Sequence, residues 1–383
     1  MGNSLFGASR ARKRSRKIDA EMLKEFQESC KGVKVLILGT SNSGKSTVIK
    51  QLRILYGKPY TEEELQKFRR LVHSNTLSFI VQLYELAIQE GDGILSAKDE
   101  NDVYCISPAA EIDESTATLI NRLWMDPGIQ QAYLDRAKAE IPESAKYFIT
   151  KANEFASEDY LPSPSDILQI RIPTRKLVTT DIEIDGTPFT FYDVSAQENN
   201  RKKWLHQFKN VEVILFVASL GDFNVISSQD PMRIKLDLAL EMFKEVMETE
   251  EFKEKSTILL LNKFDVLKEK IEQNIDPFEI HDPLGKKPWH DDQSGKKVSA
   301  TRARKYFMER FRTCHKRAKA PLIHCACALE SESVDEIFRE MEDAIIKDYM
   351  KQSIFSSMKV SATAQDKMSK FKRAGIKAAL KKK

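Results

Sequence analysis

A loop of small residues with one lysine is suited to holding phosphate groups. It follows the hydrophobic run from Val33 to Leu38 and fits the pattern G-x-x-x-x-G-K-[S/T]. Backbone N–H groups of such a loop surround phosphates, Lys45 adds positive charge at the β and γ groups, and Ser46 offers a hydroxyl to Mg²⁺. The loop consists of Gly39, Thr40, Ser41, Asn42, Ser43, Gly44, Lys45, Ser46 and Thr47. Because an apolar strand precedes it and a helical segment follows, we expect the chain to bind a nucleoside triphosphate.

A second motif, Asn262-Lys263-x-Asp265, follows an apolar strand that ends at Leu261 and indicates which base is bound. The carboxylate of Asp265 can accept both N–H groups of guanine's N1 and exocyclic amine, whereas adenine has no matching pair of donors. We expect Asn262 and Lys263 to brace the loop and cover the ring. The tetrapeptide alone is common on surfaces, but together with the phosphate loop it favours a guanine-nucleotide site.

A third motif lies between these two. Asp193 ends an alternating strand and is placed to reach Mg²⁺ through water. It begins the pattern D-V-x-x-Q, which ends at Gln197, and the basic segment R-K-K-W ends soon after at Trp204. The three motifs together place two magnesium-directed oxygens and a base-reading carboxylate in one chain.

With the late Cys325-Ala326, these motifs resemble those of the α subunit of heterotrimeric G proteins, in the family's order, from roughly Ile18 to Met350. The resemblance implies an α/β fold, a Ras-like P-loop GTPase domain with a mostly parallel sheet and an inserted all-helical domain. It predicts a basic N-terminal arm and amphipathic helix at 1–32, a GTPase domain at 33–58 and 165–355, a helical domain at 59–164 and a basic C-terminal extension at 356–383.

The same resemblance assigns catalytic roles. Arg171 precedes Asp193 by the family's interval and would neutralise charge on the γ-phosphoryl, Thr174 would ligate Mg²⁺, and Gln197 would orient the attacking water. The metal ligands would be Ser46, Thr174 and, through water, Asp193. If the loop is displaced, Arg175, Thr179 and Thr180 are alternatives for these roles.

Further nucleotide contacts are also implied by the resemblance. The N–H of Ala326 would meet the guanine oxygen, and Ser144 would contact the nucleotide across the cleft, although a plain helix cap is an equal interpretation of Ser144. The remaining predicted contacts are Leu168, Gln169, Ala196 and Cys325. His324-Cys325-x-Cys327 lacks the second ligand cluster that a structural zinc site needs.

Four departures from the family bear on hydrolysis. Ser41, Ser195 and Ala196 stand where the family has glycines, and Asn42 replaces a glutamate that pairs with the switch arginine. Because a catalytic group misplaced by about 1 Å can cost about 100-fold in rate, we predict binding and hydrolysis of GTP at a slow rate. Ordinary turnover through local shifts is one alternative, and a non-hydrolysing, nucleotide-dependent adaptor is another. The N-K-x-D motif and the helical insertion do not fit a phosphate-loop kinase.

Composition agrees with a two-domain protein at the cytoplasmic face of a membrane. The chain has 383 residues, 41% of them hydrophobic, and five scattered cysteines, as in a reducing compartment. No apolar run approaches the roughly 20 residues that span a bilayer. The net charge is +4, but residues 1–17 and 356–383 together carry +14. Basic ends on an acidic body argue against a nucleic-acid-binding face on the fold and for an anionic membrane leaflet.

The partners follow from the resemblance. The helix from Ile18 to Gly32 and Trp204 would contact a G-protein βγ dimer, and the last helix would face an activated seven-helix receptor, while the effector is not indicated. Gly2 is a candidate for myristoylation, although Phe6 stands where the motif prefers Ser or Thr and Asn3 replaces a cysteine that the family often palmitoylates. The basic residues that follow would supply the second membrane signal that one acyl chain needs; a solvated arm or a nuclear-import signal is the alternative.

The lipid hypothesis predicts that Gly2→Ala moves the protein from the membrane fraction to the soluble fraction. The reason is that the substitution removes the acyl acceptor and leaves only the basic residues to bind the leaflet. Fractionation of cells that express either form measures it, and equal pelleting of the two would remove acylation from the account.

Overall fold

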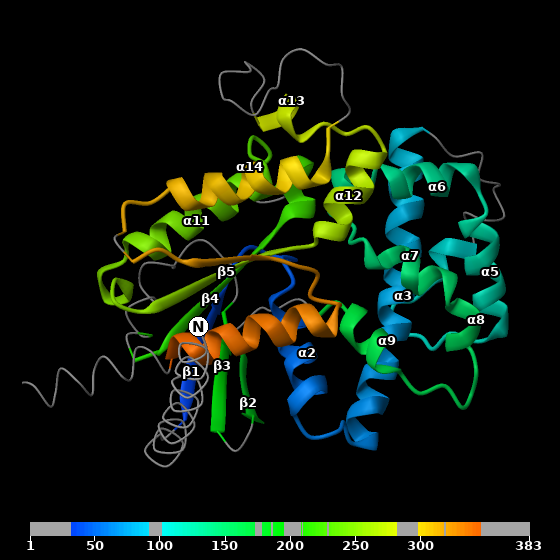
Figure 1. The fold of residues 1–383 in the computed structure, drawn as a ribbon. Helices are drawn as coiled ribbons and strands as arrows, with labels where there is room; N and C mark the ends of the chain where they lie inside the picture. Colours follow the sequence, from blue (N-terminus) through cyan, green and yellow to red (C-terminus); the bar gives the residue numbers. More distant parts are fainter. Residues whose placement is uncertain are drawn as a thin grey trace, which may run out of the picture. The chain divides into compact units, whose positions relative to one another are not determined.

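The computed structural model describes residues 32–91, 102–172, 178–184, 187–194, 208, 210–227, 230–281, 298–317 and 319–345. The chain divides into two compact units, one of Met1–Lys31 with Phe338–Lys383 and the other of Gly32–Ile337. In the first unit the described residues, 338–345, are helical. The second unit contains a six-stranded sheet and two groups of helices (Figure 1).

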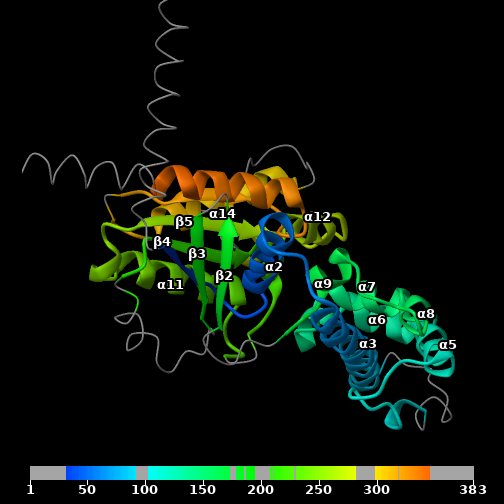
Figure 2. The same ribbon diagram turned by 90° about the horizontal axis from the view of Figure 1, so that it is seen from below.

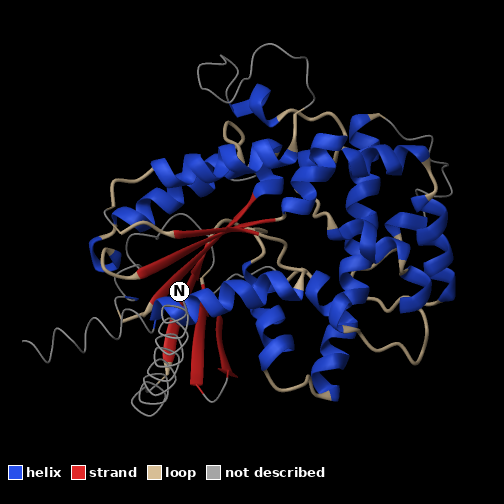
Figure 3. Ribbon diagram, viewed as in Figure 1, coloured by secondary structure: helices blue, strands red, loops and turns tan. Residues whose placement is uncertain are grey.

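The sheet has the strand order β2-β3-β1-β4-β5-β6 (Figure 3). Its strands are β1 (Val33–Leu38), β2 (Val178–Ile184), β3 (Thr187–Asp193), β4 (Val213–Ser219), β5 (Ser256–Asn262) and β6 (Leu322–Cys325). Only the pairing of β2 with β3 is antiparallel. β4 and β5 are buried along their whole length, as is typical of central parallel strands that are covered on both faces. This mostly parallel sheet confirms the predicted α/β class.

One group of helices packs against the sheet. Its members are α2 (Lys45–Tyr56), η4 (Leu220–Asn224), α11 (Lys235–Glu248), η5 (Glu250–Phe252), α12 (Phe264–Glu272), α13 (Pro277–His281) and α14 (Ala300–Thr313). α11 and α14 cover one face of the sheet and α2 the other (Figure 1). Phe243 of α11 lies 5.1 Å from Phe216 of β4 and 5.6 Å from Phe311 of α14 between ring centroids, so one aromatic side chain joins three elements of this core.

The second group is entirely helical and lies in sequence between α2 and β2 (Figure 2). It comprises α3 (Glu62–Glu90), α5 (Glu114–Trp124), α6 (Pro127–Leu134), η1 (Arg136–Ala139), α7 (Ser144–Thr150), α8 (Ala152–Phe155) and α9 (Pro164–Gln169). It has a hydrophobic core of its own, in which Phe148 contacts Phe79 and Phe155. The predicted all-helical insertion is therefore present, while its boundaries at 59 and 164 stay predictions. Among the described helices, none combines the length and hydropathy that crossing a bilayer would need.

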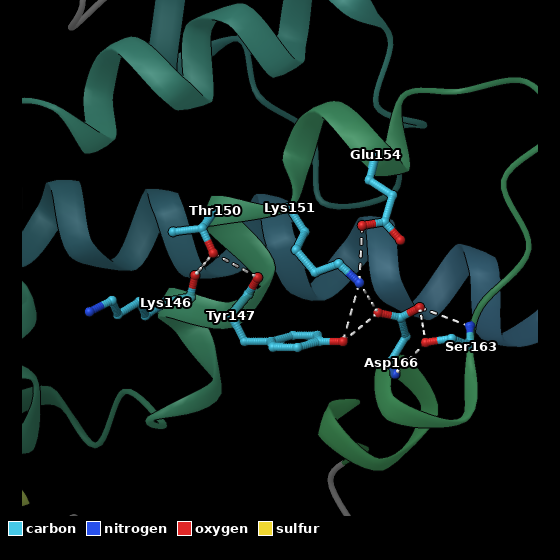
Figure 4. A network of polar contacts seen from close by, with 7 residues as sticks. All are labelled: Lys146, Tyr147, Thr150, Lys151, Glu154, Ser163 and Asp166. Atoms are coloured by element: carbon cyan, nitrogen blue, oxygen red, sulfur yellow. Dashed lines mark hydrogen bonds and ion pairs between the residues drawn. The ribbon is translucent and has the colours of Figure 1, made fainter.

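A fully buried carboxylate, Asp166, holds α9 against α7 (Figure 4). It caps the first turn of α9 by accepting from the backbone N–H and the hydroxyl of Ser163, at 2.8 and 2.7 Å. Its other oxygen accepts from the hydroxyl of Tyr147 at 2.7 Å and from Nζ of Lys151 at 2.9 Å. Because α9 ends two residues before Arg171, this network fixes the position of the backbone that leads to Arg171.

Burial alone would raise the pKa of Asp166. The hydrogen bonds from Ser163, Tyr147 and Lys151 outweigh that effect and lower its pKa below the usual value. The charged form of Asp166 is therefore the one that the folded protein stabilises.

We expect Asp166→Asn to lower the free energy of unfolding by about 3 kcal/mol at pH 7, because it removes the charge that Lys151 pairs with inside the protein. The difference between the two proteins should be fully present above the unfolded-state pKa of about 3.9 and be lost as the pH falls through the lower pKa of the folded state, where Asp166 takes up a proton. Urea titrations at several pH values measure it. The exposed acid Asp159 provides a matched control, since Asp159→Asn should change the free energy by less than about 0.5 kcal/mol. Equal effects of the two substitutions would show that the network does not stabilise the fold.

Candidate functional site

A cavity of about 700 Å³ lies at the carboxyl ends of the parallel strands, within the range of small-molecule sites. β1 has β3 on one side and β4 on the other, and ligands of open α/β sheets bind where the strand order reverses in this way. Both helix groups contribute to the wall. The predicted residues that line it are Ser41, Asn42, Ser43, Gly44, Lys45, Ser46, Thr47, Ser144, Leu168, Gln169, Arg171, Asn262, Lys263 and Asp265. The fold thus gathers the phosphate loop, the N-K-x-D motif and the segment of Arg171 around one space, although they are far apart in the sequence; Asp193 is not among the described residues that line it.

The loop between β1 and α2 takes a conformation that requires glycine at two places. Gly39 has φ +144° and Gly44 has φ +102°, and a Cβ atom would lie 2.0 Å from the carbonyl oxygen of Val217 at the first and 2.1 Å from Nδ2 of Asn262 at the second. Asn42 also has a positive φ, of 60°, which asparagine tolerates better than most residues. The loop backbone is therefore fixed by its neighbours.

Lys45 begins α2 and is buried within the loop. Its Nζ donates to the carbonyl oxygens of Gly39 at 3.0 Å and Thr40 at 2.8 Å. Burial lowers the pKa of Lys45 to about 8, although the negative charge of Asp193 opposes that shift. An anion in the cavity would raise the pKa of Lys45 again, because it favours the charged ammonium form.

Ser46 and Asp193 bring two oxygen atoms together. The hydroxyl of Ser46 donates to Oδ2 of Asp193 at 2.8 Å, while Oδ1 of Asp193 is buried and accepts no hydrogen bond from the described residues. Asp193 reaches this place because it pairs with Ile37, at the end of β1. A buried carboxylate oxygen without a donor, next to a hydroxyl, fits Mg²⁺ or its bound water, because hard cations prefer oxygen ligands.

The amide of Asn262 joins two loops. Its Nδ2 donates to the carbonyl oxygen of Ser43 at 2.8 Å, and its Oδ1 accepts from the backbone N–H of Ala328 at 2.8 Å. The next residue, Lys263, has φ +59° and forms an ion pair of 2.9 Å with Glu143 of the helical group. Burial would raise the pKa of Glu143, but Lys263 outweighs it and lowers the pKa to about 2. Nothing in the local sequence pattern indicated Glu143.

The loop after β6 begins with a continuation of the pairing between β5 and β6. The N–H of Ala326, expected to meet the guanine oxygen, donates instead to the carbonyl oxygen of Leu261 at 3.1 Å, because β5 and β6 continue their pairing there. Neither Cys325 nor Ala326 is among the described residues that line the cavity. Residues 327–329 line it instead. Burial and the nearby charge of Asp265 raise the pKa of the Cys327 thiol to about 11.

Arg171 faces the cavity from the segment that follows α9. Burial lowers its pKa from the usual value, while the charges of Glu140 and Glu143 oppose that shift. The alternatives Thr179 and Thr180 lie in β2, where they pair with β3, and are not among the described residues that line the cavity.

Several predicted site residues lie outside the described part of the chain: Gly2, Thr174, Arg175, Ser195, Ala196, Gln197 and Trp204. Their roles stay predictions.

Comparison with known protein families identifies the family of the chain. The sequence model of the G-protein alpha subunit matches residues 12–345 of the chain, which includes the cavity and both helix groups.

The lowered pKa of Lys45 predicts that affinity for a nucleoside diphosphate falls above pH 8, by up to about tenfold per pH unit. Below pH 8 the amine is already charged; above it, binding must take up a proton, because phosphate favours the ammonium form. Calorimetric titration from pH 7 to pH 10 measures the dissociation constant and the proton uptake. In Lys45→Arg the charge persists, so the dependence should flatten, and an equal slope in this variant would assign it to another group.

Proposed function

We propose that this chain, which belongs to the G-protein alpha subunit family, hydrolyses GTP to GDP and phosphate with Mg²⁺ as cofactor. Membership of that family makes it a guanine-nucleotide-binding signalling subunit. The observation that carries the proposal is the single cavity that Lys45, Ser46, Arg171 and Asp265 all line. These side chains supply a phosphate-binding ammonium, a metal-directed hydroxyl, a cation for the transition state and a base-reading carboxylate.

Each part has a separate task in the proposed reaction. The loop N–H groups and Lys45 hold the β- and γ-phosphates, and Asp265 accepts from the guanine edge. Mg²⁺, when bound by Ser46 and through water by Asp193, would neutralise phosphate charge. Arg171 stabilises charge on the γ-phosphoryl group as its bond to the leaving group, GDP, breaks and water attacks. Gln197 is proposed to orient that water.

We infer a slow rate from the phosphate loop. Ser41 is exposed and lines the cavity, so its side chain takes space beside the phosphates. Asn42 provides no negative charge to hold Arg171. Because the reaction depends on positioning, an error of about 1 Å costs about 100-fold in rate.

A non-hydrolysing adaptor is the second candidate function, and Ser41 favours it as well. If Ser41 keeps Arg171 from the γ-phosphoryl group, bound GTP would persist and the output would be partner docking alone.

We further propose that the protein acts at the cytoplasmic face of the plasma membrane with a βγ dimer. An acylated Gly2 and the basic residues of 1–17 and 356–383 would hold it to an anionic leaflet. The amphipathic residues 18–32 and Trp204 would contact the dimer, and the receptor and effector would act on the nucleotide-dependent conformation.

Single-turnover phosphate release tests hydrolysis. We expect protein preloaded with GTP and Mg²⁺ to release one phosphate slowly, and Arg171→Ala to lower the rate at least about 100-fold, because a donor to the transition state is lost.

Arg70→Ala, at an exposed position of α3, is the matched control and should leave the rate unchanged. Retention of intact GTP by the wild-type chain would favour the adaptor, and release that survives Arg171→Ala would remove Arg171 from the mechanism.

A further inference from the structure

One side chain of the helical group grips the backbone of Arg171. The N–H of Arg171 donates to Oδ1 of Asn75 at 2.7 Å, and Nδ2 of Asn75 donates back to the carbonyl oxygen of Arg171 at 3.2 Å. Arg171 lies after the end of α9 at Gln169 and before the start of β2 at Val178, so neither a helix nor a strand ladder supplies these partners. The amide of Asn75 replaces them.

Two bonds to the same residue constrain both peptide groups that flank its Cα atom. The direction in which the Cβ atom leaves the backbone is then fixed, and the long arginine side chain searches only from that starting point. Asn75 is half-buried on α3, between the buried residues His73 and Leu77 and within a helix that packs into the core of its group. A side chain on a packed helix holds a site more accurately than one on a loop.

The same segment is also tied to the phosphate loop. Lys50 of α2 is buried, and its Nζ donates to the carbonyl oxygens of Ile167 at 2.9 Å and Ile170 at 2.6 Å, which closes the end of α9. α2 begins with Lys45. α2 therefore positions both Lys45, at its start, and the end of α9, through Lys50. The hydrogen bonds from Asn75 then fix the backbone of Arg171 itself.

We propose that Asn75 is a positioning residue for GTP hydrolysis, which acts only through Arg171 by fixing its backbone at the cavity wall. This inference rests on the proposed function. It assigns to the helical group a direct part in turnover, separate from covering the nucleotide.

Single-turnover phosphate release from four proteins tests it: the wild type, Asn75→Ala, Arg171→Ala and the double variant. We expect Asn75→Ala to lower the rate about 10- to 100-fold, because the guanidinium group loses its fixed origin. The dissociation constant for GDP should stay unchanged, since Asn75 is not among the described residues that line the cavity. In the Arg171→Ala background, Asn75→Ala should have no further effect.

A second measurement does not depend on turnover. Trypsin cleavage after Arg171, mapped by mass spectrometry on the full chain, should be faster in Asn75→Ala, because the backbone there loses two bonds. The control is Asn121→Ala, which removes an exposed hydrogen bond of 2.7 Å to Asn153 in the same helix group and should change neither rate nor cleavage.

The outcomes separate this inference from the function on which it rests. A normal rate in Asn75→Ala overturns it, as does an equal loss of rate in both Arg171 backgrounds or a loss of rate matched by a loss of GDP affinity. If the wild type binds GDP but releases no phosphate, the hydrolysis proposal fails; unchanged cleavage in Asn75→Ala would then overturn the backbone grip as well, and faster cleavage would support it.

Discussion

The two hydrogen bonds of the Asn262 amide are the constraint on which the cavity depends. They connect the phosphate loop, at Ser43, with the loop after β6, at Ala328, and these two segments lie more than 280 residues apart. They also explain Gly44, since any side chain there would collide with Nδ2 of Asn262. Because the amide is buried and both its nitrogen and its oxygen are hydrogen-bonded, neither loop can move alone without leaving a polar group unsatisfied. The base side and the phosphate side of the cavity are thereby held as one piece.

Ion pairs cross the contact between the two helix groups, whereas the core of each group is apolar. Lys263 pairs with Glu143, Lys235 with Glu140 at 3.4 Å, and Arg136 with Glu269 at 3.5 Å, so three oppositely charged pairs cross from one group to the other. Ion pairs of this kind are exchanged for water at a modest net cost, unlike an apolar interface of equal size. Separation of the two helix groups at these pairs would therefore cost less than separation of an apolar interface of equal size.

The sequence predicted those parts of the site whose chemistry is local. The glycines and Lys45 are required by the shape of one short loop, and Asp193 and Asn262 end buried strands whose carboxyl ends must meet at one edge of the sheet. It did not predict Glu143 or Asn75, because their roles depend on which residue of another element lies opposite. Asn75 is one polar residue on a helix of 29, and its neighbours give no sign of its partner. The partner of the Ala326 N–H could not be predicted for a related reason: where β5 and β6 stop pairing is decided by the register of the two strands.

The length of α3 connects the orientation of the helical group with chemistry in the cavity. The helix is anchored near its start, where Arg53 of α2 donates to both carboxylate oxygens of Glu64 and lies 4.1 Å from the ring centroid of Tyr60. Asn75 is about 16 Å further along the axis, at about 1.5 Å per residue. A tilt of about 5° about that anchor would therefore carry Asn75 through about 1.4 Å, which is the scale at which transition-state contacts are lost. α3 in this sense amplifies a small rotation into a displacement at its far residues. A partner that tilts the helical group would therefore move the backbone of Arg171, and with it the proposed rate of hydrolysis, as well as change how the cavity is enclosed.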